Sequence, residues 1–423
     1  MDQIEPISAQ GRVSKIVGLM VETIGPRASV GEYCHIITRD GRELPAEVVG
    51  FRDSTTLLMP LGELEGISPG DCVLSQRQKL TVPVGPSLLG RILDGLGYPL
   101  DGRPLKTEIS YPLHNKPPNA LLRPRILESL SVGVRPIDGM LTIGRGQRMG
   151  IFAGSGVGKS TLLGMMARNT VADINVIALI GERGRELRDF IEKDLGPEGL
   201  ARSVIIVATS DQPALVRLKA AFTATAVAEY FRDNGQNVLL MMDSVTRFAM
   251  AQREVGLTVG EPPATRGYPP SVFALLPKLL ERSGMAEIGS ITGIYTVLVD
   301  GDDHNEPIAD SVRGILDGHI VLTRELAMQN QFPAIDILQS VSRVMNDVVS
   351  QEQLELAGKV REHIAVYRDA KDLIDIGAYT PGSNPKIDAA IAHMDRILAF
   401  NRQRVDEQVK YEEMLQHLKG IFG

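Results

Sequence analysis

Residues 153–161, AGSGVGKST, have the composition and spacing of a loop that binds phosphate groups. Glycines let successive backbone N–H groups curl around an anion, and a helix that begins there adds the partial positive charge of its N-terminus. Lys159 can reach the terminal phosphates, and the Ser160 hydroxyl is an oxygen ligand of the kind that Mg²⁺ accepts. Ala153 stands where the strict motif has its first glycine. We predict that this loop binds ATP and Mg²⁺ through Gly154, Ser155, Gly156, Val157, Gly158, Lys159, Ser160 and Thr161.

Two carboxylates follow apolar runs downstream of this loop. Residues 238–242 lead into Asp243, and an acid at the tip of such a strand can hold Mg²⁺ directly or through water. Glu182 follows the run 176–180, which we expect to form the strand next to the loop strand. ATP hydrolysis needs a group that orients water in line with the terminal phosphate, and Glu182 is placed for that role. On spacing alone, a charge cluster that caps the following helix is an equally good interpretation.

Three further residues carry a weaker signal. Arg183 could stabilise developing negative charge, or it could pair with the nearby Glu186. In the segment at 331–343, Phe332 could be a core residue and Arg343 an ordinary surface cation. Taken by itself, this segment is interpreted as a loop.

The apolar pattern around these residues predicts a parallel sheet covered by helices on both faces. The expected strands lie at 149–153, 176–180, 204–208, 238–242, 294–299 and 320–322. The expected helices, with apolar spacing near roughly 3.6 residues, are 159–169, 214–234 and 245–255. Because parallel strands end at one edge of a sheet, the phosphate loop and the two carboxylates should meet there.

Other patterns flank this region. The first ~80 residues contain short β-rich runs between turn signals such as Asp40-Gly41, which favour a small barrel or sandwich. Residues 81–119 are rich in proline and glycine, and we interpret them as a connecting segment on the next domain. After residue 343 the pattern is helical.

Composition limits the class of partner and the compartment. The net charge of −7 argues against broad attraction to nucleic acid or to anionic lipid. No apolar run approaches the ~20 residues that span a bilayer, and the N-terminus lacks the pattern of a secretory signal. Cys34 and Cys72 lack metal-ligand spacing, so we expect thiols in the reducing cytoplasm. An RNA translocase is an alternative class of function. It would need an aromatic and basic face on the N-terminal barrel, which the sequence does not indicate.

Several motifs, in this order, resemble the catalytic heads of rotary ATPases. They are GVRPID at 133–138, GRGQR at 144–148, the phosphate loop, GERGRE at 181–186, PAID at 333–336 and SVSR at 340–343. Within that superfamily, the chain is similar to type III export ATPases, in particular to the flagellar branch. The motifs that carry this similarity are DSVTRFAMAQR at 243–253, GEPP at 260–263 and GYPPSVF at 267–273.

The resemblance implies an α/β protein of three parts that assembles as a six-membered ring. These parts are an N-terminal β-barrel at 1–80, a central P-loop (RecA-like) parallel-sheet domain at 81–345 and a C-terminal helical domain at 346–423. Glu182 matches the catalytic carboxylate of the family, beside Lys159 and Arg183, and Phe332 matches an adenine-stacking position. Arg343 matches the arginine finger that reaches into a neighbouring subunit's site. Because one chain holds both Glu182 and Arg343, we expect a homohexamer with a site at each interface.

The resemblance also implies a cellular role and partners. The expected function is ATP hydrolysis that energises export of unfolded flagellar proteins at the cytoplasmic face of the inner membrane. The implied partners are a coiled-coil central stalk facing residues 253–263 and 376–387, a regulatory stator-type protein, the export gate and chaperone–cargo complexes. About ten residues precede Gly11, fewer than the regulator-binding stretch of relatives, so the resemblance does not extend to a regulator bound through the N-terminus. The alternatives are the ATPase of a virulence-type injectisome and, more remotely, an ATP synthase catalytic subunit.

Overall fold

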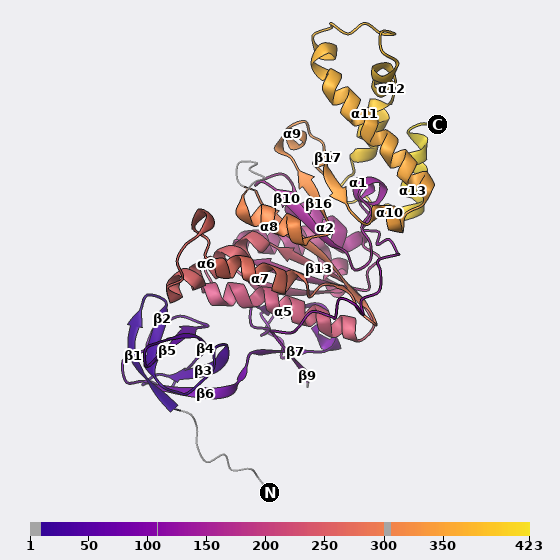
Figure 1. The fold of residues 1–423 in the computed structure, drawn as a ribbon. Coiled ribbons are helices and arrows are strands. Elements are labelled where there is room, and N and C mark those ends of the chain that lie inside the picture. Colours follow the sequence, from indigo (N-terminus) through magenta and orange to yellow (C-terminus); the bar gives the residue numbers. More distant parts are fainter. Residues whose placement is uncertain (1–9, 108, 300–305) are drawn as a thin grey trace.

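The computed structural model describes residues 10–107, 109–299 and 306–423. The expectation about a regulator bound at the N-terminus concerns residues 1–9, which lie outside this part of the chain. Figure 1 shows a small barrel, a central sheet with helices around it, and a helical hairpin that projects at the other end. The three parts follow one another along the sequence.

The N-terminal part is a closed antiparallel barrel, as expected from its short β-rich runs. Its strand order is β1-β2-β5-β4-β3-β6. The strands are β1 (Gln10–Val17), β2 (Met20–Ile24), β3 (Glu32–Ile37), β4 (Glu43–Arg52), β5 (Thr55–Pro60) and β6 (Cys72–Lys79). Alternate residues such as Cys34 and Ile36 point inward and are fully buried, which gives the barrel its own core. Cys34 and Cys72 are both free thiols.

The central sheet has the order β17-β16-β10-β15-β13-β11-β12-β8, and β14 pairs with β15. Its strands are β8 (Arg91–Asp94), β10 (Arg148–Ala153), β11 (Ile174–Ile180), β12 (Ser203–Ala208), β13 (Asn237–Asp243), β14 (Gly284–Met285), β15 (Ser290–Leu298), β16 (Gly318–Leu322) and β17 (Ile335–Ser342). The strands from β16 to β8 pair in parallel, whereas β17 and β14 are antiparallel. The expectation that the strand before Glu182 lies next to the loop strand was wrong, because β15 and β13 are inserted between β10 and β11.

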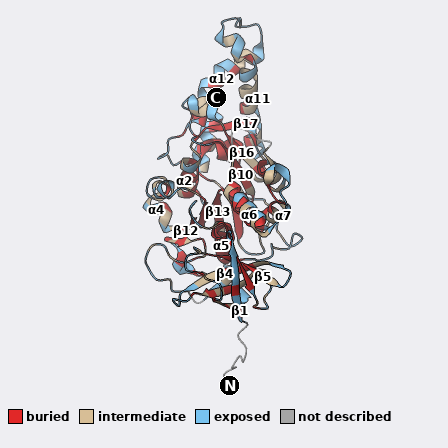
Figure 2. Cartoon of the chain, turned by 90° about the vertical axis from the view of Figure 1, so that its left-hand side faces the viewer, coloured by how far each residue is buried: buried red, intermediate tan, exposed pale blue. Residues whose placement is uncertain are grey.

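Helices cover both faces of this sheet, and successive residues of each strand point to opposite faces. They are α1 (Arg135–Met140), α2 (Lys159–Asn169), α3 (Gly184–Asp189), a π-helix (Phe190–Leu195), α4 (Gly196–Ala201), α5 (Ala214–Asp233), α6 (Val245–Val259), α7 (Pro270–Leu280), α8 (Pro307–Ile315) and α9 (Arg324–Met328). In β11, Ala178 and Ile180 belong to the core shared with α5 to α8, whereas Ile177 and Leu179 belong to the core shared with α1 and α2. Figure 2 shows the result as a buried central sheet.

Two sequence interpretations need correction. Residues 81–119 are more than a connecting segment, because β8 joins the sheet edge in parallel with β12, while β7 (Thr81–Val84) pairs with β9 (Ile109–Pro112). The segment that ends at Arg343 is more than a loop, since β17 pairs with β16. β8 is short and β17 carries polar residues, so neither shows the apolar run that predicts a strand. Each is stabilised by pairing with a neighbouring strand, which the local sequence does not reveal.

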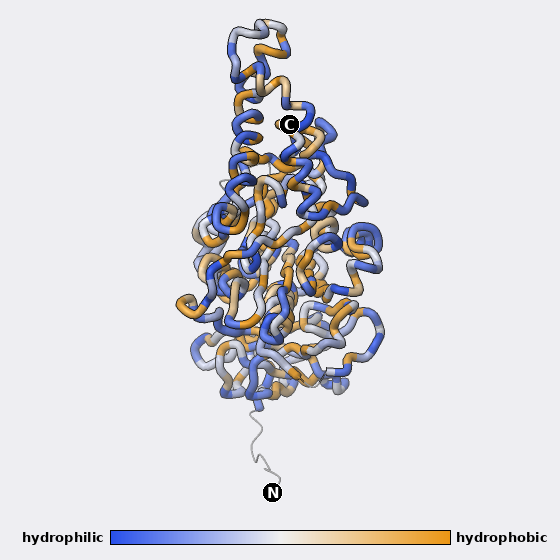
Figure 3. Tube along the Cα trace, turned by 90° about the vertical axis from the view of Figure 1, so that its right-hand side faces the viewer, coloured by the Kyte–Doolittle hydropathy of each residue, from blue (hydrophilic) through white to orange (hydrophobic). Residues whose placement is uncertain are grey.

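The C-terminal part consists of helices. They are α10 (Met345–Val348), α11 (Gln351–Asp375), α12 (Pro385–Asn401) and α13 (Tyr411–Gly420). Ser350 caps α11 and Asn384 caps α12 through side-chain acceptors. Hydrophilic and hydrophobic residues are interspersed along this projecting end (Figure 3). Among the described residues, the helices include none that is long and apolar enough to cross a bilayer.

Candidate nucleotide-binding and catalytic site

The predicted phosphate loop lies between β10 and α2, where a parallel strand delivers it to the N-terminus of a helix. Gly156 and Gly158 have φ values of 78° and 88°, a left-handed conformation that explains why glycine occupies these positions. Ala153 is buried as the last residue of β10 and needs no such conformation, so an alanine fits there. The loop borders a cavity of about 500 Å³.

Lys159 and Glu182, both predicted from sequence, line this cavity, and a third predicted residue, Asp243, is in contact with Lys159. The Lys159 ammonium contacts the Asp243 carboxylate and lies 3.7 Å from Oε1 of Glu182. The Thr296 hydroxyl donates a hydrogen bond of 2.7 Å to Asp243 and fixes that carboxylate from β15. Gly181, with a φ of 69°, turns the chain after β11, and Glu182 reaches the cavity although β11 is not adjacent to β10.

The environment of Glu182 raises the pKa of its carboxyl group into the neutral range. Burial is the main cause, and the negative charge of Asp243 adds to it, whereas Lys159 acts in the opposite direction. Together these raise the pKa of Glu182 to about 7. A carboxyl group with such a pKa can exchange a proton with water near neutral pH, which is the property required of a base in hydrolysis.

The oxygen ligands available in the cavity fit Mg²⁺ bound together with a nucleotide. Ser160 lines the cavity, and the Asp243 carboxylate contacts Lys159, which lines it too. Within residues 10–107, 109–299 and 306–423 there is no group of three acidic, histidine or cysteine side chains that could hold a metal alone. Mg²⁺ prefers a few protein oxygens completed by water and phosphate oxygens, which matches this sparse set.

Two arginines of different exposure border the same cavity. The Arg183 side chain is 79% exposed and lies 3.6 Å from Glu186, so it is at the mouth of the site. Arg247, from the first turn of α6, lies deeper and packs against Gly181. Its Nε atom is buried and has no hydrogen-bond partner among the described residues. The sequence analysis gave Arg247 no role, although its place four residues after Asp243 was the available signal.

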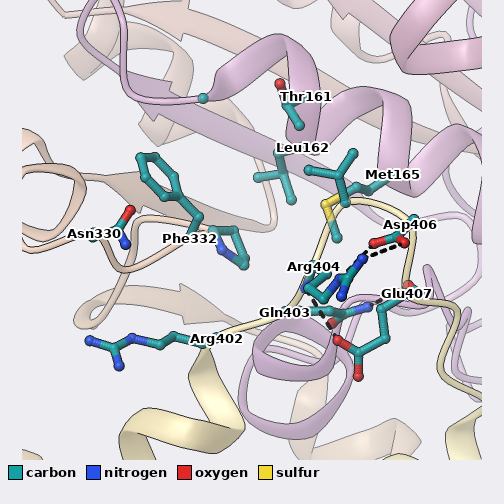
Figure 4. A pocket seen from close by; sticks show the side chains of 13 residues that line it. Thr161, Leu162, Met165, Asn330, Phe332, Arg402, Gln403, Arg404, Asp406 and Glu407 are labelled. Carbon is teal, nitrogen blue, oxygen red and sulfur yellow. Dashed lines mark hydrogen bonds and ion pairs between the residues drawn. The ribbon is translucent and has the colours of Figure 1, made fainter.

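A second cavity of about 660 Å³ adjoins the phosphate loop (Figure 4). Phe332 projects into it and is 41% exposed, which leaves a ring surface open for stacking. On the opposite side, Figure 4 shows a connecting strap, residues 402–407, between α12 and α13. The sequence analysis did not assign this strap to the site.

Arg135 anchors the strap to the central domain. Its side chain donates a hydrogen bond of 3.2 Å to the Phe400 carbonyl. It also contacts the Arg402 carbonyl and the Glu407 carboxylate. Its backbone N–H donates a hydrogen bond of 2.8 Å to the side-chain oxygen of Gln403. The motif GVRPID is thereby explained as a docking element for the C-terminal part.

Family models of known proteins match each of the three parts of this chain. Sequence models of the ATP synthase alpha/beta family match residues 133–342 (nucleotide-binding domain) and 13–76 (β-barrel domain), and the T3SS EscN ATPase C-terminal domain matches 349–420. The flagellum-specific ATP synthase of Bacillus subtilis is 57% identical over 98% of this chain and 95% of its own length. The chain belongs to the ATP synthase alpha/beta family.

Within this family, the relatives are flagellar and type III secretion ATPases. The type 3 secretion system ATPase of Xanthomonas euvesicatoria is 52% identical over 97% of this chain and 93% of its own. The assembled ATPase EscN of enteropathogenic E. coli has a TM-score of 0.93 and 48% identity, covering 98% of this chain and 100% of EscN. EscN in complex with its central stalk EscO gives a TM-score of 0.91. The chain is therefore an ATPase of flagellar or injectisome type III secretion, and the predicted family, fold class and ATPase activity are confirmed.

In this family member, Arg343 lies apart from the residues predicted to act with it. It is exposed directly after β17, where its backbone N–H donates to the Asp317 carbonyl at 3.0 Å. Among the described residues, neither set that lines the two cavities includes Arg343. Its predicted role thus requires a second copy of the chain.

Proposed function

We propose that this chain is the ATP-hydrolysing motor of flagellar type III export, acting as a homohexamer whose sites lie between neighbouring copies. One observation carries the hydrolytic part of the proposal: Lys159, in contact with Asp243, lies beside Glu182 in a cavity that adjoins the Phe332 cavity. ATP placed across the two would have its base against Phe332 and its terminal phosphate near Glu182. The products would be ADP and phosphate.

Each residue contributes a distinct part of the reaction. The N–H groups of the phosphate loop and the Lys159 ammonium bind and orient the phosphates. Ser160 and Asp243 would hold Mg²⁺, which neutralises phosphate charge when bound. Glu182, ionised, accepts a hydrogen bond from the attacking water and orients it toward the phosphorus atom. Arg247 and Arg183 offer cations to the charge that develops on the phosphate oxygens.

Arg343 supports the proposal of shared sites because it is exposed and remote from its own cavity. A guanidinium that enters from a neighbouring copy stabilises the transition state of phosphoryl transfer. The test is the ATPase rate per chain at increasing protein concentration, for wild type, Arg343→Ala and Arg343→Lys. Wild type should rise cooperatively, Arg343→Ala should stay low at every concentration, and Arg343→Lys should recover little, since Lys lacks the planar fork. A wild-type rate per chain that does not depend on concentration, together with full activity of Arg343→Ala, would reject shared sites.

A coiled-coil stalk is the proposed partner in the centre of the ring, by analogy with EscN and its stalk EscO. The proposed contact loops are 253–263 and 376–387. Glu254 pairs with Arg217 at 2.6 Å and Asn384 caps α12, so replacing either would also disturb this chain's own structure. Ile376 is 76% exposed and is the better probe. Ile376→Ser should keep basal ATPase activity and lose stimulation by the stalk protein; unchanged stimulation would reject the contact.

The flagellar assignment rests on the degree of similarity, 57% identity to the B. subtilis flagellar enzyme against 52% to the Xanthomonas secretion ATPase. The proposed setting is the cytoplasmic face of the inner membrane, with a stator-type regulator, the export gate and chaperone–cargo complexes. Deleting the gene should abolish secretion of hook and filament proteins and swimming. The likeness to EscN favours a second candidate, an injectisome motor. Loss of effector secretion with normal motility would select that candidate.

A further inference from the structure

Thr161 lies where the phosphate cavity and the Phe332 cavity meet. Among the described residues, the two linings share only Gly158 and Thr161. A nucleotide that spans both cavities therefore passes its first phosphate close to the Thr161 side chain. A hydroxyl in the first turn of the helix that follows a phosphate loop is well placed to donate a hydrogen bond to that phosphate.

The Thr161 hydroxyl already has an acceptor in the chain itself. Thr161 and Asp194 both line the phosphate cavity, close enough for the Thr161 hydroxyl to hydrogen-bond to the Asp194 carboxylate and to lower its pKa against the burial that raises it. Asp194 belongs to the π-helix that follows the Glu182 segment, and π-helical turns are frequent at functional sites. The other charged groups that act on Asp194 are Arg168, Asp189 and Lys193.

The backbone that presents Asp194 is held by a separate contact. A Cβ at Gly164 of α2 would come within 2.6 Å of the Asp194 Cβ and 2.7 Å of its backbone oxygen. The π-helix therefore lies directly on α2 because residue 164 is glycine. Since this contact uses the Cβ and the backbone of Asp194, truncating the carboxylate leaves it in place.

A hydroxyl has a single hydrogen to donate, so Thr161 can serve either Asp194 or a phosphate oxygen. We propose that Asp194 competes with the first phosphate of the nucleotide for the Thr161 hydroxyl and thereby weakens nucleotide binding. Asp194 is in this sense a positioning residue that acts through Thr161. Weaker binding of ADP favours its release, which an enzyme that turns over repeatedly requires. The inference rests on the proposed placement of the nucleotide across the two cavities.

The test is the Kd for ADP with Mg²⁺, measured by titration calorimetry on the full chain. Asp194→Ala should lower this Kd by about threefold to tenfold, because a competing hydrogen bond to a charged group is removed. A merely structural role would weaken binding or leave it unchanged. Glu192→Ala is the matched control, since it removes an exposed acid from the same helix that pairs with Arg188 and does not line the cavity.

Thr161→Val separates the hydrogen bond from the charge. The valine variant should bind ADP more weakly than wild type, and adding Asp194→Ala to it should bring no gain in affinity. An equal gain with and without the hydroxyl would show that Asp194 acts only by repelling phosphate, and would overturn the proposal. An unchanged Kd for Asp194→Ala would overturn it as well. Failure of the wild-type chain to bind ADP would instead reject the nucleotide placement itself.

Discussion

Glu182, Lys159 and Asp243 form a single charged cluster, in which the other two residues act on the pKa of Glu182. Desolvation and the nearby Asp243 favour the neutral form of Glu182, while the Lys159 ammonium favours the ionised form. The cluster therefore holds Glu182, the proposed base, near the midpoint of its titration at neutral pH.

This arrangement predicts the pH dependence of hydrolysis. Burial and the charge of Asp243 raise the pKa of Glu182 to about 7, and only the ionised form orients the attacking water. As pH falls below that value, Glu182 takes up a proton and kcat/KM should fall about tenfold per pH unit. The measurement is kcat/KM for ATP from acidic to mildly alkaline pH, with Glu182→Gln as the inactive reference. A wild-type profile that is flat across neutrality would contradict the role of Glu182.

Sequence alone reached part of the site at this scale. Lys159, Glu182 and Asp243 were found because each directly follows an apolar run or belongs to a dense motif. Arg247 and Asp194 were missed because their roles depend on where α6 and the π-helix place them. The π-helix packs on Gly164 of α2, a contact between segments that no local residue pattern predicts.

At the scale of elements, the strap at 402–407 joins the C-terminal part to the nucleotide site. Arg135 is 8% exposed and binds the strap and the end of α12 through carbonyl and carboxylate acceptors. The strap forms one wall of the Phe332 cavity. The C-terminal helices are thereby joined to a wall of the Phe332 cavity.

Arg135→Ala should consequently affect both stability and nucleotide binding. It leaves buried acceptors without a donor, and we expect a loss of about 2–4 kcal/mol in unfolding free energy. The KM for ATP should rise more than kcat falls, because the wall of the base cavity loses its anchor. Denaturant unfolding and steady-state kinetics check this, with Lys419→Ala as control, since Lys419 pairs with Glu352 at the surface of the C-terminal part and lines neither cavity. Equal small effects of both variants would contradict the anchoring role.

The order of strands could not be derived from the sequence. The apolar runs predicted the central strands, but β8 has four residues and β17 carries polar residues such as Asp336 and Gln339. Each becomes a strand through pairing with a partner that is distant in sequence: β12 lies more than a hundred residues from β8, and β16 is separated from β17 by the segment that contains α9. The position of β15 and β13 between β10 and β11 is likewise a property of the assembled sheet.

At the scale of the whole molecule, one buried polar cluster joins the barrel to the central domain. Lys219 of α5 is 2% exposed and lies 2.6 Å from Glu47 of β4. The His114 ring lies 3.1 Å from the same ammonium. Burial, followed by the charge of Lys219, lowers the pKa of His114 to about 3, so this histidine is neutral and can accept a hydrogen bond.

Removing one partner of this cluster should loosen the barrel. Lys219→Met leaves Glu47 buried without its cation, and we expect a cost of about 3 kcal/mol in unfolding free energy. The double variant Lys219→Met with Glu47→Met should recover much of that loss, because apolar side chains replace both charges. Thermal and denaturant unfolding of the two variants check this expectation. A double variant less stable than Lys219→Met alone would show that the pair is not what joins the two parts.

The three-part architecture and the ring were implied by the resemblance to the family. Periodicity alone did not distinguish a barrel from a sandwich for the N-terminal part. A site shared between copies also cannot be seen in one chain, where Arg343 and Glu182 lie apart. Complementation between two inactive variants addresses this claim directly.

The deciding measurement is the ATPase rate of an equimolar mixture of Glu182→Gln and Arg343→Ala chains that carry different tags. Where an Arg343→Ala chain supplies Glu182 and its Glu182→Gln neighbour supplies Arg343, the shared site is intact. Random assembly makes about a quarter of the sites intact, so the mixture should regain about a quarter of the wild-type rate. A mixture that co-purifies through both tags and stays as inactive as each variant alone would contradict hydrolysis at sites shared between neighbouring copies.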